Sequence, residues 1–152
     1  MRGRAYAAFV LASVALALDG CGDGGDGSSA SWSGPPKPSA DGTVDVSSFD
    51  EYESKVDETW EKTPTFAAEQ FLRLDTRSAS VTEIKAKSGP EGVGPSMVTV
   101  TLDGLPDDSI RSERWQLAFV PDDSTYRLLE ARWSQRCRAG RGHAVFSTEP
   151  CV

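Results

Sequence analysis

An apolar segment near the N-terminus constrains the fold most, because it decides which part of the chain remains to fold and in which compartment. Residues 5–18 form a largely apolar run that follows Arg2 and Arg4 and ends shortly before Cys21. A basic start, a short apolar run and small residues before a cleavage site are typical of an export signal, and the run is too short to span a bilayer stably. We therefore expect residues 1–20 to be removed and the rest to fold outside the cytoplasm.

The segment Leu18-Asp19-Gly20-Cys21 resembles the lipobox of bacterial lipoproteins. This resemblance implies that the thiol of Cys21 receives a diacylglyceryl group and that its new amino group is acylated, with palmitate as a typical acyl chain. Asp19 departs from the family pattern, which has a small apolar or hydroxyl residue there, and a cut after Ala17 for ordinary secretion is the alternative. The chain has three cysteines, and lipidation of one leaves an even pair. The expected location is the extracytoplasmic face of the cell membrane, with the lipid as anchor.

The segment after Cys21 has the composition of a linker. Residues 22–43 consist mostly of Gly, Ser, Pro and Asp, and such a segment buries too little apolar surface to offset its ordering entropy. A coil of this length spans about 25 Å on average. We expect the lipidated cysteine and a disordered linker over residues 21–43 and a single folded domain over residues 44–152.

The first part of this domain has the period of a helix. Apolar residues recur from Phe49 to Trp60, and Ser48 and Glu51 have the spacing of a capping box at the start of that helix. Pro64 interrupts the pattern, and a second short helix is predicted from about Thr65 to Leu74. The domain therefore begins with one or two helices.

Beyond Asp75 the period changes to two, which is typical of half-buried strands. The predicted strands cover residues 81–86, 98–102, 114–119 and 126–133, with turns at 105–108 and 121–124. The side chains expected on the inward, concave face are Val98, Val100, Leu102, Trp115, Leu117 and Phe119, and Leu129, Ala131 and Trp133 are expected to share one face of the last strand. Helices followed by an antiparallel meander of about four strands predict an α+β fold, similar in order to cystatin-like and ketosteroid-isomerase-like folds.

The C-terminal segment carries a second resemblance. Cys137-x-x-Gly-Arg-Gly-His143-x-x-Phe146, followed by Cys151, looks like the C-terminus of a group of small secreted and lipid-anchored proteins of actinobacteria. This resemblance covers residues 60–152 and implies a location and a domain type but no activity. We expect Phe146 to dock on the sheet edge or on a helix.

Cys137 and Cys151 are expected to form a disulfide, because the domain folds in an oxidising compartment. The alternative is a metal site made by these two thiols and His143. Structural zinc sites usually have four ligands in pairs with short spacing, whereas only these three ligands are visible and none of them forms such a pair. We favour the disulfide and expect neither a metal nor another cofactor. His143 is the single histidine, and without a nucleophile motif beside it we expect it to bond backbone groups in the Gly140–Gly142 loop.

The net charge and the distribution of charged residues limit the classes of partner that this protein is expected to bind. The chain has a formal net charge of −7, so an exported protein of this kind is a poor candidate for nucleic-acid binding. Arg136, Arg138 and Arg141 form a basic cluster near the C-terminus that could bind an anion such as a phosphate or carboxylate. The alternative is that these arginines pair with the acidic helix or remain solvated.

The sequence contains no catalytic motif, and we expect no enzymatic activity. The favoured function is a membrane-anchored interaction or binding module whose partner is a protein or another component of the cell envelope. The alternative is a small enzyme or a carrier of an apolar ligand that uses the concave face of the sheet. The apolar side chains expected on that face favour binding over chemistry.

Replacement of the lipidated residue tests the predicted location. Cys21→Ala should abolish membrane association and leave an unprocessed precursor or a secreted form, because two or more acyl chains are needed for firm anchoring and each buried methylene contributes about 0.8 kcal/mol. Membrane fractionation with mass measurement checks this. A processed Cys21→Ala protein that still sediments with membranes contradicts the prediction.

Overall fold

The computed structural model describes residues 31–89 and 94–152; Cys21 and the export segment lie outside this part. The helices are α1 (Ser47–Glu53), η1 (Thr59–Lys62), α2 (Pro64–Leu72) and η2 (Leu74–Thr76), of which η1 and η2 are 3-10 helices. The strands are β1 (Thr43–Val44), β2 (Val81–Ser88), β3 (Ser96–Asp103), β4 (Ile110–Asp122) and β5 (Thr125–Cys137). Within the described residues, no helix combines the length and the apolar composition needed to cross a membrane.

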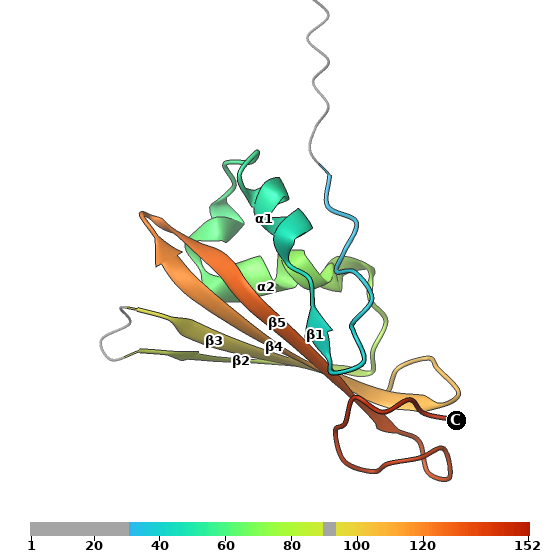
Figure 1. Ribbon diagram of the computed structural model, residues 1–152. Helices are drawn as coiled ribbons and strands as arrows, with labels where there is room; N and C mark the ends of the chain where they lie inside the picture. Colours follow the sequence, from blue (N-terminus) through green and yellow to red (C-terminus); the bar gives the residue numbers. More distant parts are fainter. Residues whose placement is uncertain (1–30, 90–93) are drawn as a thin grey trace, which may run out of the picture.

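The five strands form one antiparallel sheet in the order β1-β5-β4-β3-β2, and the helices lie over one of its faces (Figure 1). This arrangement confirms the predicted α+β class. The expectation of about four strands omitted β1, whose two residues pair with Arg132 and Ala131 of β5. The sequence gives little indication of so short a strand, because it lies inside the segment that has the composition of a linker and a turn.

The core lies between the helices and the sheet, and the strand period determines which side chains enter it. Val98, Val100 and Leu102 of β3 are at most 1% exposed, as are Leu117 and Phe119 of β4. The alternating burial along β3 and β4 confirms the predicted inward face. From the helical side, the core receives Phe49, Ala67, Ala68, Phe71 and Leu72.

A β-bulge in β5 changes which side chains of that strand share a face. Ala118 pairs with Glu130 while Phe119 pairs with Leu128, so Leu129 is an extra residue without a partner in β4. The side chain of Leu129 is 55% exposed, and Leu128 is buried in its place. The prediction that Leu129 shares a face with Ala131 and Trp133 was wrong, because strict alternation cannot include an inserted residue.

The helices are shorter than the sequence pattern suggests. The first ends at Glu53, so Trp60, expected on the same helix, belongs to η1. The predicted capping box does not form; instead the carboxylate of Asp45 accepts a hydrogen bond of 2.9 Å from the amide of Ser47. Pro64 begins α2 because proline is favoured in the first turn of a helix, where its missing amide would have no partner.

Trp32 extends the packed domain into the predicted linker. Its side chain is 8% exposed and stacks against Phe71 with ring centroids 5.8 Å apart, and it contacts Phe49 edge to face at 4.9 Å. Its indole N–H donates a hydrogen bond of 2.8 Å to the carbonyl oxygen of Phe71. Trp32 therefore packs on the core although it precedes the boundary expected at Val44, because one large aromatic side chain buries enough surface to hold an otherwise polar segment.

Trp32→Ala should lower the free energy of unfolding by about 3–5 kcal/mol, because it removes a buried indole and leaves the Phe71 carbonyl oxygen without its partner. Urea denaturation followed by circular dichroism measures this change. Val145→Ala is the control, since Val145 is 71% exposed and its truncation should change stability by less than about 0.5 kcal/mol. A Trp32→Ala protein as stable as this control would show that the segment does not belong to the core.

Candidate functional site: a groove beyond the helical layer

The sheet extends further than the helices that cover it. Strands β4 and β5 have 13 residues each, and α2 has nine. At about 3.3 Å per strand residue and 1.5 Å per helix residue, the strands are about three times as long as this helix. Figure 1 shows the start of β4 and the end of β5 continuing past the helices towards the C-terminal loop.

A groove of about 700 Å³ occupies this end of the sheet. Its lining includes residues 35–40, which we call the N-terminal strap, and the C-terminal segment with Thr148, Pro150 and Cys151. The remaining lining residues come from the loop after η2, the loop before β4 and the two long strands: Arg77, Ser109, Ile110, Glu113, Trp115, Trp133 and Gln135. Its volume and its mixture of apolar walls with a few polar groups are typical of ligand sites.

Trp115 and Trp133 mark the point at which the core gives way to the groove. They are directly opposite each other in the β4–β5 register and point to the helical face of the sheet. Trp115 is 2% exposed, whereas Trp133 is half-buried and presents part of its ring to the groove. The next pair on this face is Glu113 and Gln135, so the face changes from apolar to polar within one step of the alternation.

The polar groups of the groove are held in place. Arg77 donates a hydrogen bond of 2.7 Å to Oε2 of Glu113, and the indole N–H of Trp115 donates to the same oxygen at 3.2 Å. The guanidinium of Arg77 also lies 5.1 Å from the ring centre of Trp115. Neither hydrogen bond uses Oε1 of Glu113, so this carboxylate keeps acceptor capacity for a ligand.

A tight turn fixes the strap against β5. The hydroxyl of Ser39 donates to Asp41, and together with the amide and hydroxyl of Thr43 it lowers the pKa of Asp41 to about 2. Gly42 follows with φ +83°, and a Cβ at this position would lie 2.4 Å from the carbonyl oxygen of Trp133. Only glycine permits this close approach, which places the strap beside the groove.

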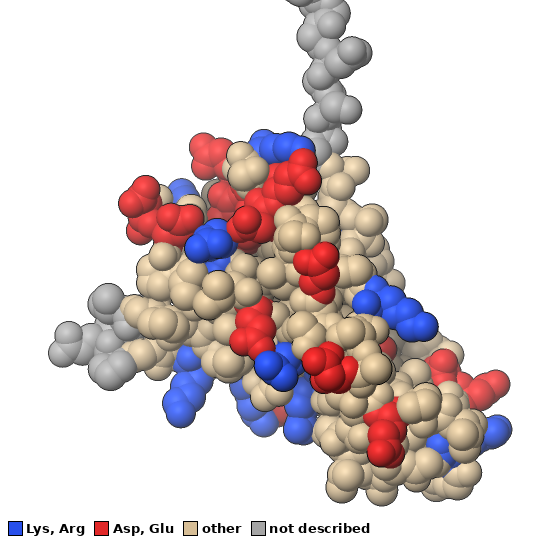
Figure 2. Space-filling view, viewed as in Figure 1, with Lys and Arg blue, Asp and Glu red and all other residues tan. Residues whose placement is uncertain are grey.

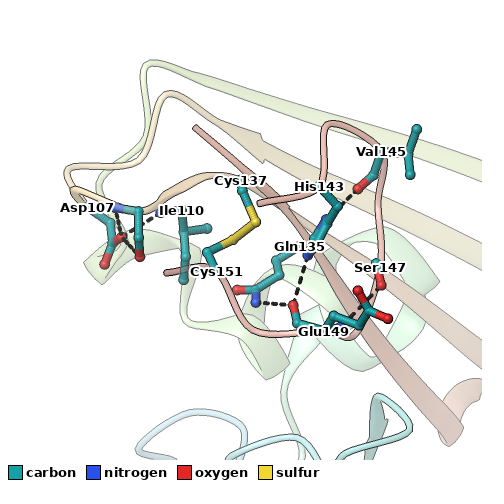
Figure 3. The surroundings of a disulfide bond; sticks show 10 residues. Asp107, Ile110, Gln135, Cys137, His143, Val145, Ser147, Glu149 and Cys151 are labelled. Carbon is teal, nitrogen blue, oxygen red and sulfur yellow. Dashed lines mark hydrogen bonds between the residues drawn. A yellow bond between two sulfur atoms is a disulfide. The ribbon is translucent and has the colours of Figure 1, made fainter. Parts of the chain in front are cut away.

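The predicted disulfide holds the C-terminal part of the groove lining in place. The sulfur atoms of Cys137 and Cys151 are bonded to each other, with their Cα atoms 5.5 Å apart (Figure 3). The imidazole of His143 lies close enough that the three side chains could in principle converge on one ion. Because each sulfur is already bonded to the other, neither is a free thiolate, and the alternative metal site is incompatible with this bonded state.

His143 joins two parts of the C-terminal loop through backbone groups, as predicted, although its partners lie beyond the Gly140–Gly142 segment. Its Nδ1 is 2.8 Å from the carbonyl oxygen of Val145 and its Nε2 is 2.9 Å from that of Glu149. These two acceptors favour the imidazolium, which can donate from both nitrogens, and they raise the pKa of His143. The stabilisation is complete below the unfolded-state pKa and is lost as the pH rises through the raised pKa.

The three arginines proposed as an anion site do not converge. Arg136 donates to Asp103 at 3.0 Å and to the hydroxyl of Ser112 at 2.9 Å. Arg138 donates to backbone carbonyl oxygens in the loop before β4. Arg141 is exposed and contributes only backbone hydrogen bonds to the loop. Two of the three guanidinium groups are therefore engaged within the protein, and neither pairs with the acidic helix.

The segment of Phe146 lies along the edge of β5, where Ser147 pairs with Gln135, and the ring of Phe146 covers the face of the sheet opposite the helices. The guanidinium of Arg114 lies 3.8 Å from its ring centre and that of Arg136 lies 5.3 Å away. In the strand register, both arginines alternate with core residues and so point to the outer face. Cation–π contact, together with the disulfide, therefore holds the C-terminal loop against this face.

The sequence predicted Trp115 on the inward face and Trp133 on the same face as Ala131, but it did not indicate Arg77, Glu113 or the strap. The position of Glu113 could have been predicted from the same alternation, because it precedes Trp115 by two residues and so lies on the same face of the strand. Arg77 and the strap come from loops whose position depends on tertiary packing. No protein-family model, curated protein or solved structure matches the chain.

Loss of the disulfide should destabilise the groove wall and the domain together. We expect Cys137→Ser and Cys151→Ser each to lower the free energy of unfolding by about 3 kcal/mol, the value for closure of a loop of this length. The double variant should be no less stable than either single variant, because each change removes the same covalent bond. Chemical denaturation measures this, and thiol titration of unreduced, denatured protein without Cys21 should detect no thiol. Two titratable thiols would contradict the disulfide.

Proposed function

We propose that the protein is an extracytoplasmic lipoprotein, anchored through Cys21, that acts as a non-enzymatic binding module through the groove between the strap and the two long strands. The ligand class that fits this groove is a small amphipathic molecule. Its apolar body would lie on Trp133, and its polar end would face Arg77 and Glu113. The observation that carries this proposal is the juxtaposition of a half-buried indole with a fixed ion pair in one groove of ligand size.

The alternative function is that of a small enzyme or an apolar-ligand carrier whose site is the concave face of the sheet. The helices cover most of that face: the side chains of Val98, Val100, Leu102 and Leu117 are at most 1% exposed. A ligand there would have to displace Phe71 and Leu72 of α2, which are fully buried against them. Binding at the uncovered end of the same face needs no such displacement. The similarity to cystatin-like and ketosteroid-isomerase-like folds therefore remains a proposal about the order of helices and strands. It does not extend to the position of a binding site.

The experiment measures binding of anilinonaphthalene sulfonate, which combines an aromatic body with an anionic end, to residues 22–152. We expect saturable binding at one site. Trp133→Ala should weaken it about tenfold, because it removes much of the apolar surface offered to the ligand. Lys37→Glu should also weaken binding, because Lys37 lines the groove and the change replaces a cation by an anion that repels the sulfonate. Because Lys37 is exposed, the change should leave the core unaffected.

Leu129→Ala is the matched control, because it removes an exposed apolar side chain from the bulge of β5, outside the groove lining. Its affinity should equal that of the unchanged protein. Equal affinity in all three variants would refute the groove as the binding site. Membrane fractionation tests the anchor separately, so failure of the groove and failure of the anchor give different results.

A further inference from the structure

A second pocket, of about 370 Å³, lies at the opposite end of the two long strands. It is formed by α1, Glu61 of η1 and the ends of β4 and β5 beside their hairpin turn. Its lining contains the four carboxyl groups of Asp50, Glu53, Glu61 and Asp122, together with Ser54, Thr125, Tyr126 and Arg127. Figure 2 shows acidic side chains gathered over the part of the surface around α1.

Two of these carboxyl groups are buried without adequate partners. Glu61 is only 7% exposed, and its Oε1 has no hydrogen-bond partner. Both carboxyl oxygens of Glu53 are also buried without a hydrogen-bond partner of normal geometry. A buried carboxylate in this state is costly, because desolvation is not offset by hydrogen bonds or by an opposite charge. Three buried acceptor oxygens of residues that line the pocket therefore lack a hydrogen-bond partner.

The surrounding charges do not neutralise the pair. Burial raises the pKa of Glu53 to about 7; the charges of Asp50 and Glu61 act in the same direction, while the Leu128 amide and Arg127 oppose it. Burial likewise raises the pKa of Glu61, with a further contribution from the charges of Asp57 and Glu58.

Arg127 is the one cation in the lining, and it is directed to other acids. It lies 3.6 Å from Asp50 and 3.8 Å from Asp122, both longer than a good charged hydrogen bond. Its guanidinium therefore does not satisfy the oxygens of Glu53 and Glu61. The pocket keeps an excess of negative charge beside those two side chains.

We propose that this acidic pocket binds a primary alkylammonium group, with Glu53 and Glu61 as its acceptors. A primary ammonium carries three N–H donors, which matches the three unsatisfied oxygens. The aromatic ring of Tyr126 lines the pocket and can attract the same cation. Rotation about the side-chain bonds of the two glutamates brings their carboxylates to the bound cation. A free amine and a lysine side chain of a partner protein share this chemistry.

A metal ion fits the pocket less well than an ammonium group. Among the residues that the structure describes, the group of three side chains close enough to ligate one ion is Cys137, His143 and Cys151, at the other end of the molecule. The carboxyl groups of the acidic pocket do not converge to that extent. The volume of the pocket also exceeds that of a bare ion and leaves room for a short alkyl chain.

Calorimetric titration of residues 22–152 with cadaverine and, separately, with acetyl-lysine amide carrying a free side-chain amine tests the proposal. Both should bind at pH 8, whereas the uncharged analogue acetyl-norleucine amide should not. Glu53→Gln and Glu61→Gln should each weaken binding at least about tenfold, because each removes a charged acceptor. Asp108→Asn is the control: it removes one exposed negative charge near the other end of β4 and should leave binding unchanged.

The pH dependence separates binding from a purely structural role. Affinity should fall as the pH decreases from 8 to 6, because protonation of Glu53 competes with the cation, and binding at pH 7 should release protons to the buffer. Without a ligand, Glu53→Gln should be at least as stable as the unchanged protein at pH 8, because it removes an unpaired buried charge.

The test also distinguishes the sources of the cation. Binding of acetyl-lysine amide but not of cadaverine favours a lysine of a partner protein, and the reverse favours a free amine. Saturable binding of calcium or magnesium with no binding of either amine would overturn the proposal. So would equal affinity of the unchanged protein and both glutamine variants.

Discussion

The pairing of β4 with β5 determines most of what this protein can do. Twelve residue pairs join these strands, and the resulting ribbon is far longer than the helices that pack against it. The helical layer covers the hairpin end of the ribbon, where the acidic pocket lies between α1, η1 and the strands. The other end of the ribbon extends past the helices, and the groove lies there. The position of the groove is thus a consequence of unequal element lengths.

Much of the fold can be predicted from the periodicity of apolar residues in the sequence. Where these predictions were wrong, the physical causes can be identified. The alternation from Val98 to Leu102 and from Trp115 to Phe119 correctly predicted one face of the sheet. Leu129 was misplaced because a single inserted residue reverses the alternation. Trp32 was missed because composition averages a whole segment, whereas burial is decided by individual side chains.

The candidate sites were less predictable than the fold, because both depend on contacts between distant segments. The groove joins the strap, the loop after η2 and the C-terminal disulfide, which are separated by tens of residues in the sequence. Glu53 and Glu61 belong to a run of acids that resembles a solvated helical surface. Their burial arises from the β4–β5 hairpin folding against α1 and η1, which periodicity does not reveal.

Under the anchoring at Cys21 that we propose, the packing of Trp32 would set the distance from the membrane within which the domain can move. Ten residues separate Cys21 from Trp32, and a fully extended chain covers at most about 3.6 Å per residue. The first core residue then lies within about 40 Å of a lipid on Cys21, half the distance that a tether ending at Val44 would allow. A domain held so closely samples a thin layer beside the bilayer, where the effective concentration of any membrane-bound partner is high. Weak affinity in the groove would therefore suffice for occupancy on a membrane surface although it would fail in dilute solution.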